Sequence, residues 1–317
     1  MSNGLTAKEI SRLKGEGFIF QRDKEHFVCR VITVDGNLKP REVKKLADIS
    51  EKYGYGYISF TSRLTVEIPG IKYEKVEKVK RELEKVGLYP GGTGPKVRPI
   101  TSCKGTVCKF GLMDTQMLNR KIHDRFYLGW NNVILPHKFK IGVGGCPNNC
   151  AKPNLNDFGI IAQRKPKLDY EACAGCKKCR VEDVCKVGAV KRVDEKITID
   201  FDKCNNCGLC IEECHLNAVK IDKEGVKIFI GGKWGKFPKI GEPLKGIHTE
   251  EEALNIIEKA ILYYKANGIP GERFGEMIDR IGFNEVEKEL LSDDILEQKE
   301  EILKNKTGGE AAISSSC

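Results

Sequence analysis

Two copies of one cysteine-rich unit, 31 residues apart, restrict what this chain can fold into more than any other feature. The first copy is DYEACAGCKKC and the second is DFDKCNNCGLC, and each continues through one more cysteine to an AVK tripeptide. A CxxCxxC triplet places three thiolates at three corners of an iron–sulfur cube. The cysteines that repeat in this way are Cys173, Cys176 and Cys179 in the first copy and Cys204, Cys207 and Cys210 in the second.

The fourth ligand of each cluster is expected to come from the other copy, as in two-cluster ferredoxins. That rule assigns Cys214 to the first cluster and Cys185 to the second. Two details depart from the usual pattern: five residues rather than three separate Cys179 from Cys185, and Lys186 and His215 replace the proline that usually follows the fourth cysteine. The alternative is a pair of zinc sites, which favour separated CxxC pairs. We favour two [4Fe–4S] clusters.

The cysteine content also indicates the compartment. The chain has 14 cysteines among 317 residues, and its N-terminus lacks the apolar run of a secretory signal. We therefore expect a cytoplasmic protein whose thiols bind metal. No stretch reaches the roughly 20 apolar residues that span a bilayer. Acidic residues alternate with basic ones despite the net charge of +9, so we expect no nucleic-acid partner, and the surplus suits anionic cofactors or substrates.

The rest of the chain has the pattern of an α+β protein. Before the Gly- and Pro-rich joint PGGTGPK, strands and helices are predicted in the order β-α-β-β-α of a ferredoxin-like split βαβ unit. Such a small open sheet usually packs against something larger. We expect four units: a ferredoxin-like N-terminal domain (1–92), a larger α+β domain (93–164 and 226–300), an inserted two-cluster ferredoxin module (165–225) and a disordered tail (301–317).

Three helices are predicted with defined ends. Apolar residues at helical spacing predict helices over 40–53 and 73–86, and each is followed by a glycine. A third helix is predicted over 249–267, where Thr249 and Glu252 have the spacing of a capping box. All three lie outside the cysteine-rich repeat, as expected for ordinary globular domains.

Four further cysteines lie in TSCKGTVCKFG and GGCPNNC. Their layout resembles the cluster site of the sirohaem-containing sulfite and nitrite reductases, in which two cysteine pairs hold one [4Fe–4S] cluster and the last cysteine also ligates the sirohaem iron. The resemblance assigns Cys103, Cys108, Cys146 and Cys150 to a third cluster, with Cys150 as the bridging thiolate. Four residues rather than the family's five separate Cys103 from Cys108, but CKGTVC keeps a glycine where the backbone must turn sharply.

Cationic residues extend the resemblance. GYISFTSRLTVEIPGI resembles the family segment whose Thr-x-Arg contacts sirohaem and the bound anion, here Thr61 and Arg63. KVRPITSC places Arg98 before the first cysteine pair, and LPHKFK resembles the family's lysine pair, here Lys138 and Lys140. FIGGKWGKFPKIGEPL and GERF resemble its closing part. The similarity is greatest to the sirohaem subunit of anaerobic sulfite reductases and to small dissimilatory-type sulfite-reductase-like proteins.

The resemblance implies an enzyme that reduces sulfite to sulfide with six electrons. Fixed cations near the open face of the haem would bind this dianion and stabilise charge as its S–O bonds break. Arginine binds oxyanions in a planar fork and lysine can also transfer protons. The candidate catalytic residues are therefore Arg63, Arg98, Lys138 and Lys140.

Electrons are expected to enter through the ferredoxin insert, from a partner subunit or a soluble ferredoxin, because no flavin or nicotinamide site is evident. We expect an oligomer or a heteromeric complex. Two alternatives stay open: nitrite or another small anion suits the same cofactors, and a chain with clusters but no sirohaem would be an electron-transfer subunit. The cation ring distinguishes the enzyme hypotheses from the carrier hypothesis, since a pure carrier does not need it.

Overall fold

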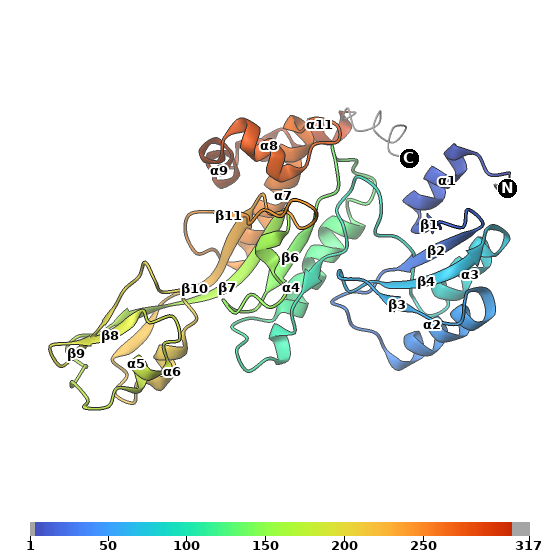
Figure 1. The fold of residues 1–317 in the computed structure, drawn as a ribbon. Helices are drawn as coiled ribbons and strands as arrows, with labels where there is room; N and C mark the ends of the chain where they lie inside the picture. The colour runs from blue at the N-terminus through green and yellow to red at the C-terminus, as the bar shows by residue number, and fades with distance from the viewer. Residues whose placement is uncertain (1–3, 306–317) are drawn as a thin grey trace.

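The computed structural model describes residues 4–305, which form three lobes arranged in a row (Figure 1). Each lobe has its own cluster of buried apolar side chains. The N-terminal cluster runs from Leu13 to Leu88, the central one combines residues 97–160 with 226–302, and the smallest runs from Val181 to Val219. The chain therefore leaves the central lobe, builds the small lobe and returns.

The N-terminal lobe is an antiparallel sheet packed by helices. Its elements are α1 Ala7–Gly15, β1 Phe18–Phe20, β2 His26–Val31, α2 Pro40–Tyr53, β3 Ser59–Phe60, β4 Val66–Lys72, the 3₁₀ turn η1 Tyr73–Lys75 and α3 Val76–Glu84. The strand order is β1-β2-β4-β3. In β2 the buried Phe27, Cys29 and Val31 alternate with less buried residues, as expected for a strand with one face on the core. The helix predicted over 40–53 is confirmed by α2.

The central lobe is a five-stranded mixed sheet with helices packed around it. Its elements before the C-terminal helices are β5 Thr101–Ser102, η2 Gly105–Val107, α4 Thr115–Ile122, the π-helix η3 His123–Leu128, β6 Ile141–Gly144, η4 Pro153–Leu155, β7 Phe158–Leu168, β10 Val219–Ile230, β11 Glu242–Pro243 and α7 Glu250–Asn267. The strand order is β11-β10-β7-β6-β5. The strands β5, β6 and β7 are parallel, so the loops that follow β5 and β6 leave from the same edge of the sheet.

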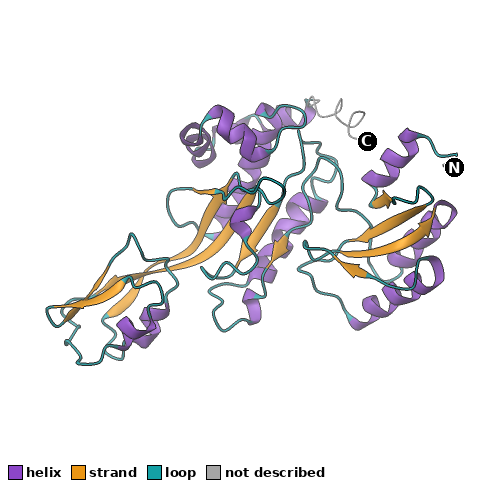
Figure 2. Cartoon of the chain, in the orientation of Figure 1, coloured by secondary structure: helices purple, strands orange, loops and turns teal. Residues whose placement is uncertain are grey.

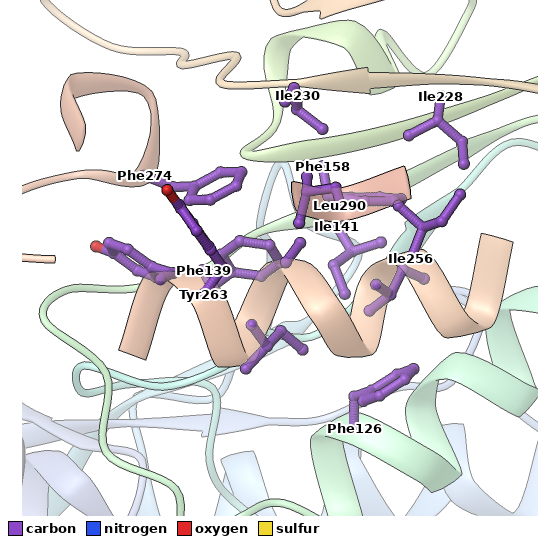
Figure 3. Close-up of a cluster of buried hydrophobic side chains, with 14 of the residues drawn as sticks. Phe126, Phe139, Ile141, Phe158, Ile228, Ile230, Ile256, Tyr263, Phe274 and Leu290 are labelled. Atoms are coloured by element: carbon purple, nitrogen blue, oxygen red, sulfur yellow. The ribbon is translucent and has the colours of Figure 1, made fainter. Parts of the chain in front are cut away.

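Helix α7 lies along the core of the central lobe (Figure 3). The Thr249 hydroxyl accepts a hydrogen bond from the Glu252 N–H, and the Glu252 carboxylate accepts one from the Thr249 N–H, so the predicted capping box and helix are confirmed. Beside this helix, the ring of Phe139 lies 5.2 Å from that of Phe274, edge to face. This aromatic contact packs the segment before β6 against the start of α8.

The small lobe is attached by a continuous β-ribbon (Figure 2). β7 and β10 pair antiparallel from Phe158 and Ile230 in the central lobe out to Leu168 and Val219. The expected boundaries at residues 165 and 225 therefore lie inside strands, because β7 and β10 run without a break from the central lobe into the small lobe. Between these strands lie α5 Arg180–Val184, β8 Val190–Val193, β9 Lys196–Ile199 and α6 Leu209–Glu213.

Short helices close the central lobe at its C-terminal end: α8 Phe274–Ile281, α9 Phe283–Leu291, α10 Asp294–Glu297 and α11 Lys299–Lys304. The tail expected from residue 301 thus begins inside α11, because Ile302 is buried in the central core. The remainder of that expected tail, 306–317, lies outside the described residues. None of the helices between residues 4 and 305 has the length and apolar character needed to cross a membrane.

Candidate active site

The first predicted ligand set surrounds one hollow in the small lobe. A pocket is lined by Cys173, Cys176, Cys179 and Cys214 together with apolar residues and two charged ones, Arg192 and Glu195. Three of these cysteines belong to the first copy of the repeat and one to the second. The structure therefore brings together the four residues that the ferredoxin rule groups.

The second predicted set is also gathered in the small lobe. Burial raises the pKa of Cys204, and the charges of Cys207 and Cys185 raise it further. Burial raises the pKa of Cys210 to about 12, and Cys207, Cys204 and Cys185 add to that rise. Because charges perturb a thiol in this way mainly from nearby, the four cysteines lie in the same part of the small lobe. Coordination to a metal would stabilise their charged forms.

The fourth cysteine of each copy has the same local environment. Cys185 Sγ accepts a hydrogen bond from the Ala189 N–H at 3.3 Å, and Cys214 Sγ accepts one from the Ala218 N–H at 3.3 Å. Both donors belong to the AVK tripeptides. Hydrogen bonds to a ligating sulfur tune the potential of a cluster. The longer gap before Cys185 therefore leaves its environment equivalent to that of Cys214.

The paired cysteines, which lie outside the repeat, follow the parallel strands β5 and β6 and are Cys103, Cys108, Cys146 and Cys150. Burial raises the pKa of Cys146, and the charges of Cys103, Cys150 and Cys108 raise it further. The Gly145 N–H donates to Cys103 Sγ at 3.1 Å, which ties the two loops together. A Cβ on Gly145 would lie 2.9 Å from the Cα of Gly105, so this approach requires glycine.

Cys150 differs from the other three paired cysteines because it is exposed. Its thiol is therefore open to a group outside the lobe. Between residues 4 and 305 there is no group of three or more His, Cys, Asp or Glu side chains arranged to hold a metal ion. The first ligand set is therefore grouped by the pocket that its four cysteines line, and the other two sets by the effect of each cysteine's charge on the pKa of its neighbours.

A cluster of charged residues, which we term the cation site, gathers around the N-terminal end of β6. Its members are Arg63, Arg98, Lys138, Lys140, Arg273 and Asp157. They come from the β3–β4 loop, the segments before β5, β6 and β7, and the residue that precedes α8. Burial lowers the pKa of Lys140 to about 8, and the neighbouring charges of Arg63, Arg273 and Lys138 lower it further. The structure therefore brings all four predicted cations together.

Two arginines of this site, Arg63 and Arg98, donate hydrogen bonds to backbone carbonyls. Arg63 donates to Pro99 O at 2.5 Å and to Ile141 O at 3.2 Å, and its Nη1 donates to Asn156 Oδ1 at 2.8 Å. Arg98 donates to a backbone carbonyl, that of Gly92, and its buried Nε has no partner. Burial lowers the pKa of each guanidinium to about 10. Arg63 thus joins the N-terminal lobe to the central sheet.

Thr61 shapes the loop that carries Arg63. Its Oγ1 lies 2.7 Å from Thr65 Oγ1 and accepts a hydrogen bond from the Arg63 N–H at 3.2 Å. The backbone then turns through Leu64 with a φ of +60°, a left-handed conformation that few side chains adopt. Thr61 therefore shapes the loop in the conformation from which the Arg63 side chain reaches the central lobe.

The lysines are the unengaged cations of the site. In the described part of the chain, the ammonium groups of Lys138 and Lys140 form no hydrogen bond or ion pair, and only charges and burial act on them. Burial also lowers the pKa of Lys138. His137 is neutral at physiological pH, because burial lowers its pKa to about 4, and its Nδ1 accepts the Lys138 N–H at 2.8 Å. The two lysines can therefore bind an incoming anion directly.

Two members of the cation site were not predicted as site residues from the sequence. Arg273 lies in the GERF segment, which was noted only as part of the family pattern, and Asp157 lies in NLNDFG without any motif. Arg273 Nη2 donates to both carboxylate oxygens of Asp157 at 2.8 Å. A charged residue directly before a buried apolar run was the available signal for Asp157.

Two protein-family models match this chain. Residues 93–299 match the nitrite and sulphite reductase 4Fe-4S domain, and residues 19–86 match the nitrite/sulfite reductase ferredoxin-like half domain. These two matches cover the central and N-terminal lobes, with the small lobe falling inside the larger match.

Two relatives extend this similarity. The chain is 35% identical over 279 residues to a coenzyme F420-dependent sulfite reductase of Methanocaldococcus jannaschii, covering 86% of this chain and 44% of that protein. It therefore spans less than half of that relative's length. It is 30% identical to the alpha subunit of a dissimilatory-type sulfite reductase of Allochromatium vinosum, covering 86% of this chain and 71% of the subunit.

A solved structure shows the same fold. The crystal structure of dissimilatory sulfite reductase I superposes with a TM-score of 0.67 at 23% sequence identity, over 84% of this chain and 69% of that chain. The α+β class expected from the sequence is thereby confirmed. At this identity the likeness establishes architecture alone.

Proposed function

Because the chain belongs to the nitrite and sulphite reductase family, we propose that it reduces sulfite to sulfide with six electrons on a sirohaem coupled to a [4Fe–4S] cluster. The resemblance found in the sequence is confirmed by both family models. Our proposal concerns the identity of the substrate and the number of iron–sulfur clusters.

The excess of positive charge at the cation site is the observation that supports this function most strongly. Five cations surround one acid, and that acid is already paired with Arg273. The ammonium groups of Lys138 and Lys140 are thus left without a counterion. Preorganised cations in a partly buried site favour a small dianion, and they stabilise charge that develops as S–O bonds break.

The residues present also fit a large polar cofactor. Cys150 is exposed, so it could ligate a metal outside the lobe while it also holds a cluster together with Cys103, Cys108 and Cys146. Four buried side-chain polar atoms of the described residues lack a partner, and three of them, Arg98 Nε, Arg273 Nε and Asn149 Oδ1, belong to the cation site or to the Cys150 loop. Buried polar atoms normally have partners. Sirohaem, when bound, would supply the metal at which the anion is reduced.

The chain's own residues would bind the substrate and deliver protons. Lys140, with its pKa near 8, is mostly charged at neutral pH and can still release a proton at little cost. Lys138 adds a second unpaired ammonium group. Arg63 and Thr61 would fix the N-terminal lobe against the site and contact the cofactor, and Arg98 would add fixed positive charge.

Electron entry through the small lobe is supported by one cavity. Cys146 of the paired cysteines and Cys207 of the repeat line the same pocket. The second copy of the repeat therefore lies beside the proposed catalytic cluster. With [4Fe–4S] clusters in both repeat sets, electrons from a partner subunit or a soluble ferredoxin would cross the small lobe to this point. We place this reaction in the cytoplasm, as part of an oligomer or heteromeric complex.

The test is an assay of the full chain, purified anaerobically and reconstituted with iron, sulfide and sirohaem. We expect tetrapyrrole absorption and viologen-driven turnover of sulfite. The Lys138→Ala/Lys140→Ala variant should lose roughly a hundredfold in kcat/KM, because site cations of this kind contribute that much to a reaction that develops charge. The control is Lys78→Ala, an exposed lysine on α3 far from the site; equal losses in both variants would contradict the proposal.

Nitrite assayed alongside decides between the alternatives. Clearly higher kcat/KM for nitrite would make the protein a nitrite reductase on the same residues. Clusters without any tetrapyrrole absorption would leave an electron-transfer subunit.

A further inference from the structure

Asp157 and Arg273 form a buried ion pair that also holds a predicted catalytic lysine. Asp157 is fully buried and Arg273 is 8% exposed. The Arg273 guanidinium donates to both carboxylate oxygens, and Asp157 Oδ2 accepts a third hydrogen bond from the Lys140 N–H at 2.9 Å. One carboxylate therefore connects the start of α8 to the residue that enters β6.

The backbone around this pair is locked by further contacts. The Phe158 N–H donates to Lys140 O at 3.0 Å, and the Gly231 N–H donates to Asp157 O at 2.9 Å. Each of the charged residues has an aromatic neighbour in the chain that is buried in the core shown in Figure 3: Phe139 beside Lys140, Phe158 beside Asp157 and Phe274 beside Arg273. Because packed cores do not yield smoothly, Lys140 cannot move independently of Asp157 and Arg273.

The same pair sets the charge balance of the site. The Asp157 charge raises the pKa of Lys140, and the Arg273 charge lowers it. Burial raises the pKa of Asp157 itself, while Arg273 and Lys140 oppose that rise. The charged and titratable groups that face Lys140, Asp157 or Arg273 are Arg63, Arg98, Lys138, His137, Tyr264 and Glu276.

We propose that Asp157 and Arg273 are positioning residues: together they fix the Lys140 backbone, and their opposite charges set the electrostatic balance around its ammonium group. This inference rests on the proposed function, since it explains how the substrate-binding lysine is held. It involves no contact between either residue and the reacting anion.

The test compares variants whose effects differ in sign. Asp157→Asn keeps an acceptor for the Lys140 N–H but removes the negative charge, so the Lys140 ammonium should titrate about one pH unit lower. Arg273→Gln removes a repelling cation, so Lys140 should titrate higher. The double variant removes both charges and should return the titration close to that of the unmodified chain.

Two readouts apply to the full, cofactor-loaded chain. The first is the titration of lysines labelled as ¹³C-dimethylamines, followed by NMR without substrate and assigned with Lys140→Arg. The second is the alkaline limb of kcat/KM for sulfite, which should shift in the same direction as the lysine signal in each variant. The control is Arg280→Gln. Arg280 lies on α8 and forms a surface ion pair with Glu272, so its replacement should change neither the lysine titration nor the alkaline limb.

Shifts of the same sign in both single variants, or no shift in either, would overturn the inference, because a purely structural pair lowers stability without opposite effects on a lysine. A double variant no better than Asp157→Asn would overturn it as well. If Asp157→Asn does not fold, the upward shift in Arg273→Gln decides alone. The NMR titration needs no turnover, so a failure of the proposed function would be seen separately, as loss of sulfite reduction with the lysine shifts intact.

Discussion

The two cysteine-bearing regions of the molecule are assembled in opposite ways. The small lobe takes both of its ligand sets from one stretch of chain, between Cys173 and Cys214. The cation site and the paired cysteines draw on segments from Thr61 to Arg273, in two lobes. A contiguous site can be specified by spacing alone, whereas a composite site needs the packed core to bring its parts together.

The hydrophobic cores beneath these two regions differ in size. The buried cluster beneath the repeat is small, and one of its members is Cys210, itself a predicted ligand. The composite site rests on the largest cluster, in which Phe139, Phe158 and Phe274 are completely buried. Metal ligation should therefore contribute a larger share of the stability of the small lobe than of the central lobe, because ligand binding to a weak core is part of its folding free energy.

The largest expected effect comes from the exposed thiol of the composite site. Cys150→Ser should abolish sulfite turnover, because this residue is the proposed link between cluster and haem. Its exposure predicts an unchanged fold and an unchanged thermal transition. Iron analysis should show at most about four iron atoms lost per chain, since the repeat sets are untouched. Turnover that survives with full tetrapyrrole absorption would contradict the assignment.

The pH dependence tests the same site more finely. Lys140 has a lowered pKa, near 8, so it is protonated below that value and loses its charge above it. The kcat/KM for sulfite should therefore fall about tenfold between pH 8 and pH 9.5. In Lys140→Arg this alkaline limb should disappear, because a guanidinium stays charged throughout that range. If kcat/KM of Lys140→Arg still falls at alkaline pH, the fall is caused by a titratable group other than Lys140 and the prediction is wrong.

Removing a cysteine of the repeat should have an effect on turnover that depends on which electron donor is used. Cys207→Ser removes a predicted ligand that lines the cavity shared with Cys146. Turnover driven by a protein donor should be lost, while a small viologen can reach the paired cysteines directly and should support most of the original rate. The matched variant Cys176→Ser affects the first copy and should show the same donor dependence. An equal loss of turnover with both donors would contradict this prediction, because it would mean that the paired cysteines cannot work without the repeat.

The smallest effect is expected at the contact between the two lobes. Arg164 donates to Glu224 at 2.7 and 2.9 Å and to Glu212 at 3.3 Å, and both acids are well exposed. Arg164→Gln should change the free energy of unfolding by less than about 1 kcal/mol, as is usual for surface ion pairs. Chemical denaturation followed by circular dichroism measures this. A much larger loss would show that side-chain charges, rather than the β7–β10 ribbon, attach the small lobe.

The sequence predicted features that depend on local spacing. The repeat and the helix over 249–267 each lie within one short stretch of chain, whereas the four cations lie in separate segments and were grouped by family resemblance alone. The bounds of the inserted module were expected at residues 165 and 225, but both positions lie inside β7 and β10, because the pairing of two strands far apart in the chain cannot be read from local spacing. Asp157 and Arg273 were missed because they are 116 residues apart and neither belongs to a cysteine or lysine motif.

The most direct measurement is a sulfite titration of the anaerobically purified, cofactor-loaded chain, followed by visible absorption without any electron donor. The account predicts a tetrapyrrole band that sulfite shifts in a saturable way, with binding roughly a hundredfold weaker in Lys138→Ala/Lys140→Ala and unchanged in Lys78→Ala. A chain with no tetrapyrrole band, or one whose band responds to sulfite equally in all three proteins, would contradict the claim that these lysines and Cys150 form one reducing centre.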